Sequence, residues 1–370
     1  MRLCTIRAAV LLALLALTGA GHAATLTATP ATIGGVLVRA RGGDVLKLAP
    51  GTYEGLAPKA WTFSPGLTIT SADPSHPAVL TNFDAHNIKG VTFSNLDLLA
   101  KGPAYFAFQI FDSTDVHFDR VNVHGVVDEG RPRNDAEGIR FSGGSTVSVT
   151  NSEFHDLKRA FAIGDTEGVT VSGNRAHDLQ VTGFMFGGAT THITVTDNTV
   201  WNIRPMPGDH PDAIQFLTAG SKAPATDILV ARNVVFRGDG SATQGIFFRD
   251  QVGTLPFERV TIADNLVVGT GYNGILVMGA KDLAITGNEL VSNPGSANNT
   301  WLRVETAQGV TASRNRAQLI SFVTSTGVKE KSNKLTSPVS DRGLAALHGW
   351  AATHPHRAPA IADMLARLAP

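Results

Sequence analysis

The chain has 370 residues, with 31 lysines and arginines against 31 aspartates and glutamates, so its formal net charge is 0. It therefore lacks the overall positive field that attracts nucleic acid, and we expect no nucleic-acid partner. Glycine is abundant, with 38 residues, whereas tyrosine and methionine number only 3 and 5. This composition favours many short strands joined by tight turns over a helical protein.

Residues 1–23 have the features of a secretory signal peptide. Two arginines precede an apolar run from Ala8 to Leu17, and Gly21-His22-Ala23 provides a small-x-small cleavage site. The apolar run is shorter than the roughly 20 residues that a membrane-spanning helix needs, which argues against the alternative of a membrane anchor. We predict an exported protein, periplasmic or secreted, that starts near Ala24 and does not insert into a membrane.

A short pattern, apolar-x-apolar-x-x-Asn, recurs through the rest of the chain. Its copies end at Asn174, Asn198, Asn233, Asn265, Asn288, Asn315 and Asn333. The alternation inside each copy is typical of a strand with one buried face. Coils of a parallel β-helix lie about 4.8 Å apart, so equivalent asparagines would form a column in which each amide bonds to the next. We interpret this column as a structural device.

A second family of short strands precedes these copies, with outer residues predicted to point inward and the middle residue outward. Its members are Ile139-Arg140-Phe141, Phe161-Ala162-Ile163, Phe184-Met185-Phe186, Ile214-Gln215-Phe216, Ile246-Phe247-Phe248, Ile275-Leu276-Val277 and Leu302-Arg303-Val304. The inward columns would form the continuous apolar core that parallel sheets require.

The predicted fold is all-β, a right-handed parallel β-helix over residues 24–336. Ala31 to Ala40 reads as a short capping helix at its start. Residues 337–370 read as a helical tail, either a cap or a flexible appendage, broken around His354-Pro355-His356.

The chain resembles the pectin lyase-like superfamily of right-handed β-helices. The resemblance rests on LKLAPGTYEGL near the first coil, on GVTFSNLDL at Gly90 to Leu98 and on the asparagine-anchored repeats, and it covers roughly Ala31 to Asn333. Members of this superfamily include polysaccharide lyases, glycoside hydrolases, esterases, uronate epimerases and some non-catalytic surface proteins. The mannuronan epimerase group carries an Asp-Pro-His element, and Asp209-His210-Pro211-Asp212 has these residue types in a different order.

Cleavage of an acidic polysaccharide by β-elimination needs a base and a positive group that neutralises the sugar carboxylate. We therefore searched the outward positions of the second strand family and the turn before it. The alignment predicts two columns: Glu137, Arg159, Thr182, Asp212, Gln244 and Asn273 just before the strand, and Arg140, Ala162, Met185, Gln215, Phe247, Leu276 and Arg303 on its outward side.

The segment from Met206 to Phe216 is the strongest candidate for a site. His210 can act as base or acid near neutral pH, Asp212 would orient it or hold a cation, and Gln215 would contact substrate. The alternative is that His210-Pro211-Asp212 is only a turn, since aspartate and proline are ordinary turn residues. Both readings stay open.

Cationic side chains near this segment are candidates for binding a substrate carboxylate, because guanidinium groups meet carboxylates in a bidentate way. The alternative for each arginine is an ion pair between coils with Glu137, Asp165 or Asp250. The predicted catalytic residues are His210, Asp212, Arg249 and Arg159, and the predicted substrate-binding residues are Lys158, Arg140, Gln215, Glu137, Asp250 and His177.

A further column contains His124, His155, His177 and Trp201, each three residues after a turn anchor. These rings would stack, either as a metal site or sugar platform or simply as aligned surface residues. Acidic clusters at Asp128-Glu129, Asp135-Glu137 and Asp165-Glu167 offer ligands for calcium, but none has the spacing of a dedicated calcium loop. We assign no metal residues, and no cofactor is required.

These features together predict an exported polysaccharide lyase that acts on an acidic, uronate-containing polysaccharide. We expect no binding partner other than that substrate, and we expect the protein to be a monomer. A glycoside hydrolase or a uronate C5-epimerase using the same residues is one alternative. A non-catalytic β-helix that binds a glycan or supports the cell envelope is the other.

Overall fold

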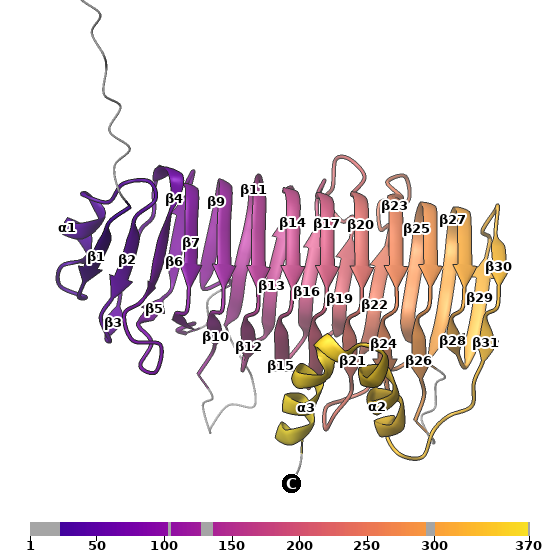
Figure 1. Ribbon diagram of the computed structural model, residues 1–370. Helices are drawn as coiled ribbons and strands as arrows, with labels where there is room; N and C mark the ends of the chain where they lie inside the picture. Colours follow the sequence, from indigo (N-terminus) through magenta and orange to yellow (C-terminus); the bar gives the residue numbers. More distant parts are fainter. Residues whose placement is uncertain (1–22, 103–104, 127–135, 294–299, 369–370) are drawn as a thin grey trace, which may run out of the picture.

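The computed structural model describes residues 23–102, 105–126, 136–293 and 300–368. In these ranges the chain winds into a stack of coils that follow one another from the N-terminal end, in indigo, to the C-terminal end, in yellow (Figure 1). Strands of neighbouring coils pair in parallel, for example β11 with β13 and β16 with β19. The predicted parallel β-helix is confirmed.

Within the described residues the strands form two sheets, which we call sheet A and sheet B. The nineteen strands of sheet A are β1 (Thr25–Ala28), β2 (Val45–Leu48), β4 (Thr62–Ser71), β6 (Phe83–His86), β7 (Lys89–Ser94), β9 (Phe108–Asp119), β11 (Glu137–Thr150), β13 (Arg159–Gly164), β14 (Glu167–Ser172), β16 (Thr182–Gly187), β17 (Thr191–Thr196), β19 (Asp212–Leu217), β20 (Thr226–Ala231), β22 (Gln244–Arg249), β23 (Phe257–Ala263), β25 (Asn273–Thr286), β27 (Trp301–Ser313), β29 (Leu319–Val323) and β30 (Lys329–Lys331). The twelve strands of sheet B are β3 (Thr52–Tyr53), β5 (Val79–Thr81), β8 (Asp97–Leu99), β10 (Asn122–His124), β12 (Glu153–His155), β15 (Arg175–Leu179), β18 (Thr199–Ile203), β21 (Val234–Phe236), β24 (Leu266–Val268), β26 (Glu289–Val291), β28 (Arg316–Ala317) and β31 (Lys334–Leu335).

Sheet A supplies two successive stretches of each coil. In the central coils the first stretch is β13, β16, β19 and β22, and the second is β14, β17, β20 and β23, whereas β11, β25 and β27 run through both. We call the outward side of the first stretch face 1. Sheet B supplies the third stretch, so each coil passes face 1, the second stretch and sheet B before the next coil begins.

The core lies between the sheets and consists of the inward columns that the sequence predicts. Rings of successive coils stack, with centroid distances of 4.5 Å for Phe161 and Phe184, 4.6 Å for Phe186 and Phe216, and 4.1 Å for Phe216 and Phe248. All five of these rings are buried. Such aromatic pairs add about 0.5–1.5 kcal/mol beyond the burial of their area.

The asparagine column is present and continuous from Asn174 to Asn333. The side chain and backbone N–H of Asn198 both donate to Asn233 Oδ1, at 2.9 and 3.0 Å, and Asn198 Nδ2 also donates to Val171 O. Asn233 repeats the pattern with Asn265 one coil further on. The amides thus satisfy turn backbone groups that would otherwise be buried without partners.

Each anchor follows a residue in the left-handed conformation, which makes the sharp corner between the second stretch and sheet B. The preceding φ is +70° at Gly173 and +68° at Gly287, and Asp197 and Asp264 adopt +60° and +52°. Glycine and aspartate tolerate this region better than most residues, so their place before these anchor asparagines favours the corner.

The N-terminal end is covered by a short helix, as expected. Helix α1 (Ile33–Leu37) follows β1 and is shorter than the predicted Ala31 to Ala40. Its Val36 is buried in the core cluster, so the helix shields the first coil.

The C-terminal segment forms two helices, α2 (Leu344–Thr353) and α3 (Ala358–Arg367), with the 3-10 turn η1 (Pro355–Arg357) at the predicted break between them. The helices lie along the side of the stack, against sheet B, and not over its end (Figure 1). Leu347, Trp350, Ile361 and Met364 are buried there against Trp201 and other apolar residues of β18, β21, β24 and β26. The predicted helical C-terminal tail is confirmed, and it packs against sheet B at the side of the stack.

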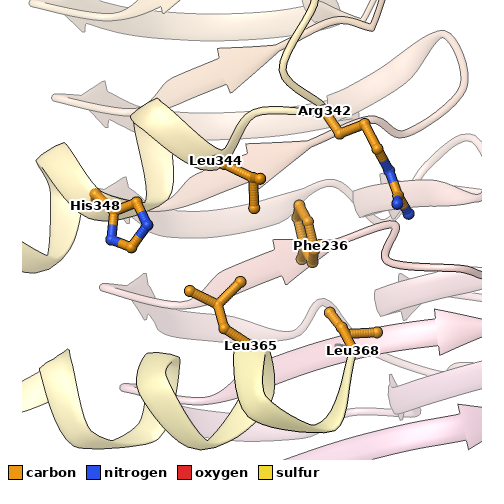
Figure 2. A pocket seen from close by; sticks show the side chains of 6 residues that line it. All are labelled: Phe236, Arg342, Leu344, His348, Leu365 and Leu368. Carbon is orange, nitrogen blue, oxygen red and sulfur yellow. The ribbon is translucent and has the colours of Figure 1, made fainter. Parts of the chain in front are cut away.

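A small cavity of about 310 Å³ lies between the two helices and β21. Figure 2 shows Leu344, His348, Leu365 and Leu368 of the helical segment around the ring of Phe236. Its lining is mostly apolar, so it is part of the contact between the helices and the stack.

Candidate functional site

The polar column predicted before the face 1 strands is aligned as expected. Glu137 pairs with Arg159, Arg159 with Thr182, Thr182 with Asp212 and Asp212 with Gln244. The outward column is aligned as well, with Met185 beside Gln215 and Gln215 beside Phe247. Residues far apart in sequence are therefore neighbours on adjacent coils.

The second residue of each of these strands is skipped in the pairing. In β19 the paired residues are Asp212 and then Ile214, and Ala213 is passed over. The skipped position is occupied by small residues because space is short: a Cβ on Gly183 would lie 2.4 Å from the carbonyl oxygen of Ala213. One extra residue brings the first and fourth residues to the same side, so Asp212 and Gln215 both belong to face 1.

Asp212 is completely buried, with 0% of its surface exposed. Its Oδ2 accepts hydrogen bonds from Gln215 Nε2 and from His210 Nδ1, the latter at 3.0 Å, while Oδ1 has no partner among the described residues. Burial raises the pKa of the Asp212 carboxyl, and the hydrogen bond from His210 offsets only part of that effect.

His210 is oriented by this carboxylate but remains accessible. The bond from Nδ1 to Asp212 fixes which nitrogen carries the proton, and it raises the pKa of the imidazole above its ordinary value. The ring packs edge-on against Phe247, with a centroid distance of 5.3 Å, and 58% of the side chain is exposed. Its Nε2 lies 2.9 Å from Gln244 Nε2, which suits an amide donor and an imidazole acceptor.

The loop that carries His210 is tied to the preceding coil. Gln180 Nε2 donates to Asp209 Oδ2 at 2.9 Å, and the same oxygen accepts the backbone N–H of Met206 at 2.8 Å. The Arg204 guanidinium forms an ion pair with Asp178. These contacts position His210 before any ligand is bound.

Arg159 forms the intercoil ion pair that was the alternative to ligand binding. Its NH1 donates to Glu137 Oε2 at 2.5 Å, and both side chains are largely buried. Burial raises the pKa of Glu137, although Arg159 opposes this shift. Among the described residues, however, Arg159 Nε is buried without a partner, as are Thr182 Oγ1 and Asp212 Oδ1 on the next two coils. Three adjacent coils therefore each present a buried polar atom that a ligand on face 1 could satisfy.

Arg249, Arg140 and Lys158 form no ion pair with the described residues. Arg249 is exposed at the end of β22, near enough to His210 that its charge acts to lower the imidazole pKa. Arg140 lies over the rings of Tyr105, Phe106 and Phe111, at 5.7, 5.9 and 6.0 Å from their centroids. These cations are available to an anionic ligand.

Two predicted substrate-binding residues have other roles in the structure. Asp250 accepts hydrogen bonds from Thr218 Oγ1 at 2.8 Å and from the backbone N–H groups of Gly253 and Leu255, so its carboxylate holds the loop after β22. His177 belongs to sheet B, and not to face 1. It is buried beside α3, where Arg367 lies 3.3 Å from its Nε2.

The predicted column of His124, His155, His177 and Trp201 is stacked, with centroid distances of 5.2, 5.4 and 4.3 Å. Both nitrogens of each imidazole are engaged by protein atoms: Asp97 and Gly125 O for His124, Asn122 and Asp156 for His155, and Asp178 and Glu153 for His177. No ring has a lone pair left for a metal, so the column is structural.

Across the part of the chain that the structure describes, no group of three or more His, Cys, Asp and Glu side chains could hold a metal ion. Of the acidic clusters considered for calcium, Asp128, Glu129 and Asp135 lie outside the described residues. Asp165 accepts the backbone N–H of Ala189 at 2.9 Å. In the same described ranges, no helix has the length and apolarity needed to cross a membrane.

The sequence predicted the polar column as far as Asn273 and missed its continuation at Trp301. Asn273 Nδ2 donates to Gln244 Oε1, and Trp301 Nε1 donates to Asn273 Oδ1 at 2.6 Å. Trp301 also stacks with Tyr272 at 5.6 Å. The sequence contains a sign of this continuation. Trp301 directly precedes Leu302, whereas Asp212 precedes Ile214 with the skipped residue between them, so Trp301 takes the corresponding position in a strand that lacks the skipped residue.

Comparison with known families agrees with this geometry. A family model described as "Right handed beta helix region" matches residues 77–290, more than half of the chain. The chain belongs to this family. Right-handed β-helices of known structure are similar to it over most of their length, but no curated protein sequence matches it significantly.

Two solved structures illustrate the likeness. A mannuronic acid specific polysaccharide family 6 lyase from human gut microbiota is 11% identical, with a TM-score of 0.59, over 85% of this chain and 82% of that one. The A-module of a mannuronan C-5 epimerase from Azotobacter vinelandii is 12% identical, with a TM-score of 0.53, over 84% and 92%. At these identities the likeness establishes the right-handed β-helix fold and not the chemistry of face 1.

Proposed function

We propose that this protein is a polysaccharide lyase that cleaves an acidic, uronate-containing polysaccharide by β-elimination on face 1. The observation that carries the proposal is the His210–Asp212 pair: an accessible imidazole whose Nδ1 is held at 3.0 Å by a fully buried carboxylate. Acidic sugars suit the site because Arg249, which forms no ion pair with the described residues, lies near His210. The similar lyase and epimerase, whose names refer to mannuronic acid and mannuronan, support the same class of substrate.

In this mechanism His210 is the base. Because Nδ1 donates its proton to Asp212, Nε2 carries the lone pair, which accepts the Gln244 amide at 2.9 Å in the structure. Once the substrate displaces that amide, Nε2 removes the proton from the sugar carbon next to the carboxylate. Asp212 stabilises the imidazolium that forms, as a buried carboxylate does in other His–Asp pairs. The electron pair of the C–H bond becomes a C=C bond, the glycosidic C–O bond breaks, and the leaving oxygen takes a proton from the imidazolium.

The substrate carboxylate must be neutralised for the adjacent proton to become acidic enough. Arg249 is the best placed cation for this role, since it is exposed, close to His210 and without a carboxylate partner among the described residues. Gln215 and Gln244 flank the pair and offer amide groups to sugar hydroxyls. Arg159 lies on the same face, but its guanidinium forms an ion pair with Glu137.

The direct test is to mix the protein with polymannuronate, polyguluronate and polygalacturonate and to follow the absorbance of unsaturated product ends. We expect the absorbance to rise with the wild type. The rate of that rise should be about 100-fold or more lower for His210→Ala, because general-base catalysis typically contributes that much. His192→Ala is the control, because that imidazole is exposed on β17, outside face 1.

The same assay separates the rival functions. New reducing ends without absorbance would indicate a glycoside hydrolase, and altered sugar stereochemistry at constant chain length would indicate an epimerase. Saturable binding with no product would indicate a non-catalytic glycan-binding protein. Each of these results would replace the lyase proposal.

We also propose that the protein is exported and acts as a monomer. The signal-like residues 1–23 support export, and the first strand begins at Thr25, directly after the proposed cleavage site. Mass determination of the protein recovered from outside the cytoplasm should give an N-terminus near Ala24, and retention of the first 23 residues there would contradict the proposal.

A further inference from the structure

A second cluster on face 1 has the features of a ligand site and plays no part in the mechanism above. It consists of Arg140 on β11 with Tyr105, Phe106 and Phe111 around it. Arg140 occupies the same outward column as Gln215, three coils away through Ala162 and Met185. At about 4.8 Å for each coil, the two side chains are about 14 Å apart along the stack.

Aromatic rings hold the Arg140 side chain, and it forms no ion pair with the described residues. Three aromatic rings lie within 6.0 Å of its guanidinium carbon, yet no described carboxylate or carbonyl accepts a hydrogen bond from it. Cation–π contact satisfies the faces of a guanidinium and leaves the N–H groups at its edge free. A half-buried cation with free donors is suited to a carboxylate ligand.

Other arginines of the stack are treated differently. Arg120, Arg232 and Arg259 each form ion pairs with an aspartate at distances of 2.6–2.8 Å. Arg175 and Arg316 pair with glutamates on neighbouring coils. Apart from Arg120, whose partner is the adjacent Asp119, these arginines pair between neighbouring coils. Arg140 has no such partner among the described residues, at a place where the ring of Tyr105 is 66% exposed.

The surface between this cluster and Asp212 can carry a sugar chain. The two intervening outward residues, Ala162 and Met185, are apolar, and neither carries a charge that would repel or trap an acidic polymer. Their apolar surface suits the C–H faces of sugar rings. A chain bound along the stack would therefore meet Tyr105 and Arg140 at one end and His210 at the other.

We propose that Arg140 and Tyr105 form a distal subsite for a uronate unit, with Arg140 binding its carboxylate and Tyr105 packing against its ring. This inference rests on the proposed acidic polysaccharide substrate and adds a prediction about its length. Fragments that span the three coils gain from the subsite, and fragments confined to the surroundings of His210 do not. The subsite thus makes the protein prefer polymers over short fragments.

Calorimetric titration with mannuronate fragments, one a disaccharide and one long enough to span about 14 Å, measures this directly. The proteins are the wild type, Arg140→Met, Tyr105→Ala and the control Arg120→Met, which alters an arginine at a different corner of the coil. We expect Arg140→Met to weaken binding of the long fragment about tenfold or more, the usual effect of losing a charge-assisted hydrogen bond, with Tyr105→Ala acting in the same direction. Affinity for the disaccharide and all affinities of the control should stay unchanged.

The inference is overturned if the long fragment binds Arg140→Met and Tyr105→Ala as tightly as the wild type, or if the wild type binds no uronate fragment. Cleavage is scored separately by absorbance. Binding that depends on Arg140 without any unsaturated product would leave the subsite in place and reject the lyase function. Cleavage whose rate does not change in Arg140→Met at any fragment length would support the lyase function and reject the subsite.

Discussion

The chemistry of the candidate site depends on two residues that are two positions apart. His210 gains its orientation and its raised pKa from Asp212, and Asp212 gains its raised pKa from burial. An imidazole that acts as a base must be neutral, so kcat/KM should rise with pH as His210 loses its proton, at a pH above the ordinary value of about 6.5.

Asp212→Asn tests this coupling. The change removes the hydrogen-bonded carboxylate that is the main cause of the raised His210 pKa, so that pKa should fall and the acidic limb of the pH profile should move to lower pH. The maximal rate should drop as well, because the imidazolium loses its stabilising charge. The measurement is kcat/KM across pH for both proteins. An acidic limb that stays in place in Asp212→Asn would show that His210 does not titrate as the base.

Single residues also decide the stability of the corners. Asn233→Ala should lower the free energy of unfolding by about 2–4 kcal/mol, since it leaves the N–H groups of Asn198 and the carbonyl of Val195 buried without partners. Asn333→Ala is the matched variant at the end of the ladder. Its side chain makes the same bonds, with Asn315 and the Ala312 carbonyl, but is partly exposed, so water can replace them and the cost should be clearly smaller. Urea denaturation measures both, and equal costs would contradict the ladder interpretation.

At the scale of the element, the C-terminal helices are fastened to sheet B by an apolar contact with ionic contacts around it. Trp350 is buried and donates to the Asp264 carbonyl at 3.3 Å, Arg367 pairs with Glu153 at 2.5 Å, and Arg357 donates to Thr199 Oγ1 at 2.8 Å. Burial lowers the pKa of Arg357 to about 10, which still leaves the side chain charged at neutral pH.

Trp350→Ala should release this segment without unfolding the coils. Truncating a buried tryptophan costs about 3–5 kcal/mol, which exceeds what the exposed ion pairs contribute. Limited proteolysis read by mass should then cut between β31 and α3 while the stack stays intact. Ala352→Ser, at an exposed position of the same helix, should leave the cleavage pattern unchanged. A Trp350→Ala protein as resistant as the wild type would refute the fastening role.

The elements differ in how far the sequence predicts them. Coil register was predictable because the asparagine anchors and the outward columns recur, so the alignment of Asp212 with Thr182 and Gln244 followed directly. The position of the C-terminal helices was not predictable from the sequence, because it depends on which coils expose an apolar side of sheet B. The Arg159–Glu137 pair was foreseen only as one alternative, because register brings the residues together without saying whether they bond. The buried, unsatisfied state of Asp212 Oδ1 needed coordinates.

The whole molecule behaves as a nearly one-dimensional stack, in which each coil is stabilised mainly by its two neighbours. Its two ends are unequal. The first coil is shielded by α1, whereas the last strands, β30 and β31, consist of exposed residues, and Leu335 is 71% exposed. The chain then returns along the side of the stack, so α2 and α3 strengthen the central coils and leave the final one uncovered (Figure 1).

Hydrogen exchange should therefore show a gradient of protection along the stack. Backbone N–H groups of β16 and β19, which have paired coils on both sides and buried aromatic stacks beneath them, should exchange only through large-scale opening. Those of β29 to β31 should exchange much faster, through fraying that needs no disruption of the core. Asp212 and Arg249 belong to such central strands, β19 and β22, each of which pairs with a coil on either side. Equal protection of β31 and β19 would mean that the last coil is covered in solution, for example by a second copy of the chain, and would contradict the monomer proposed above.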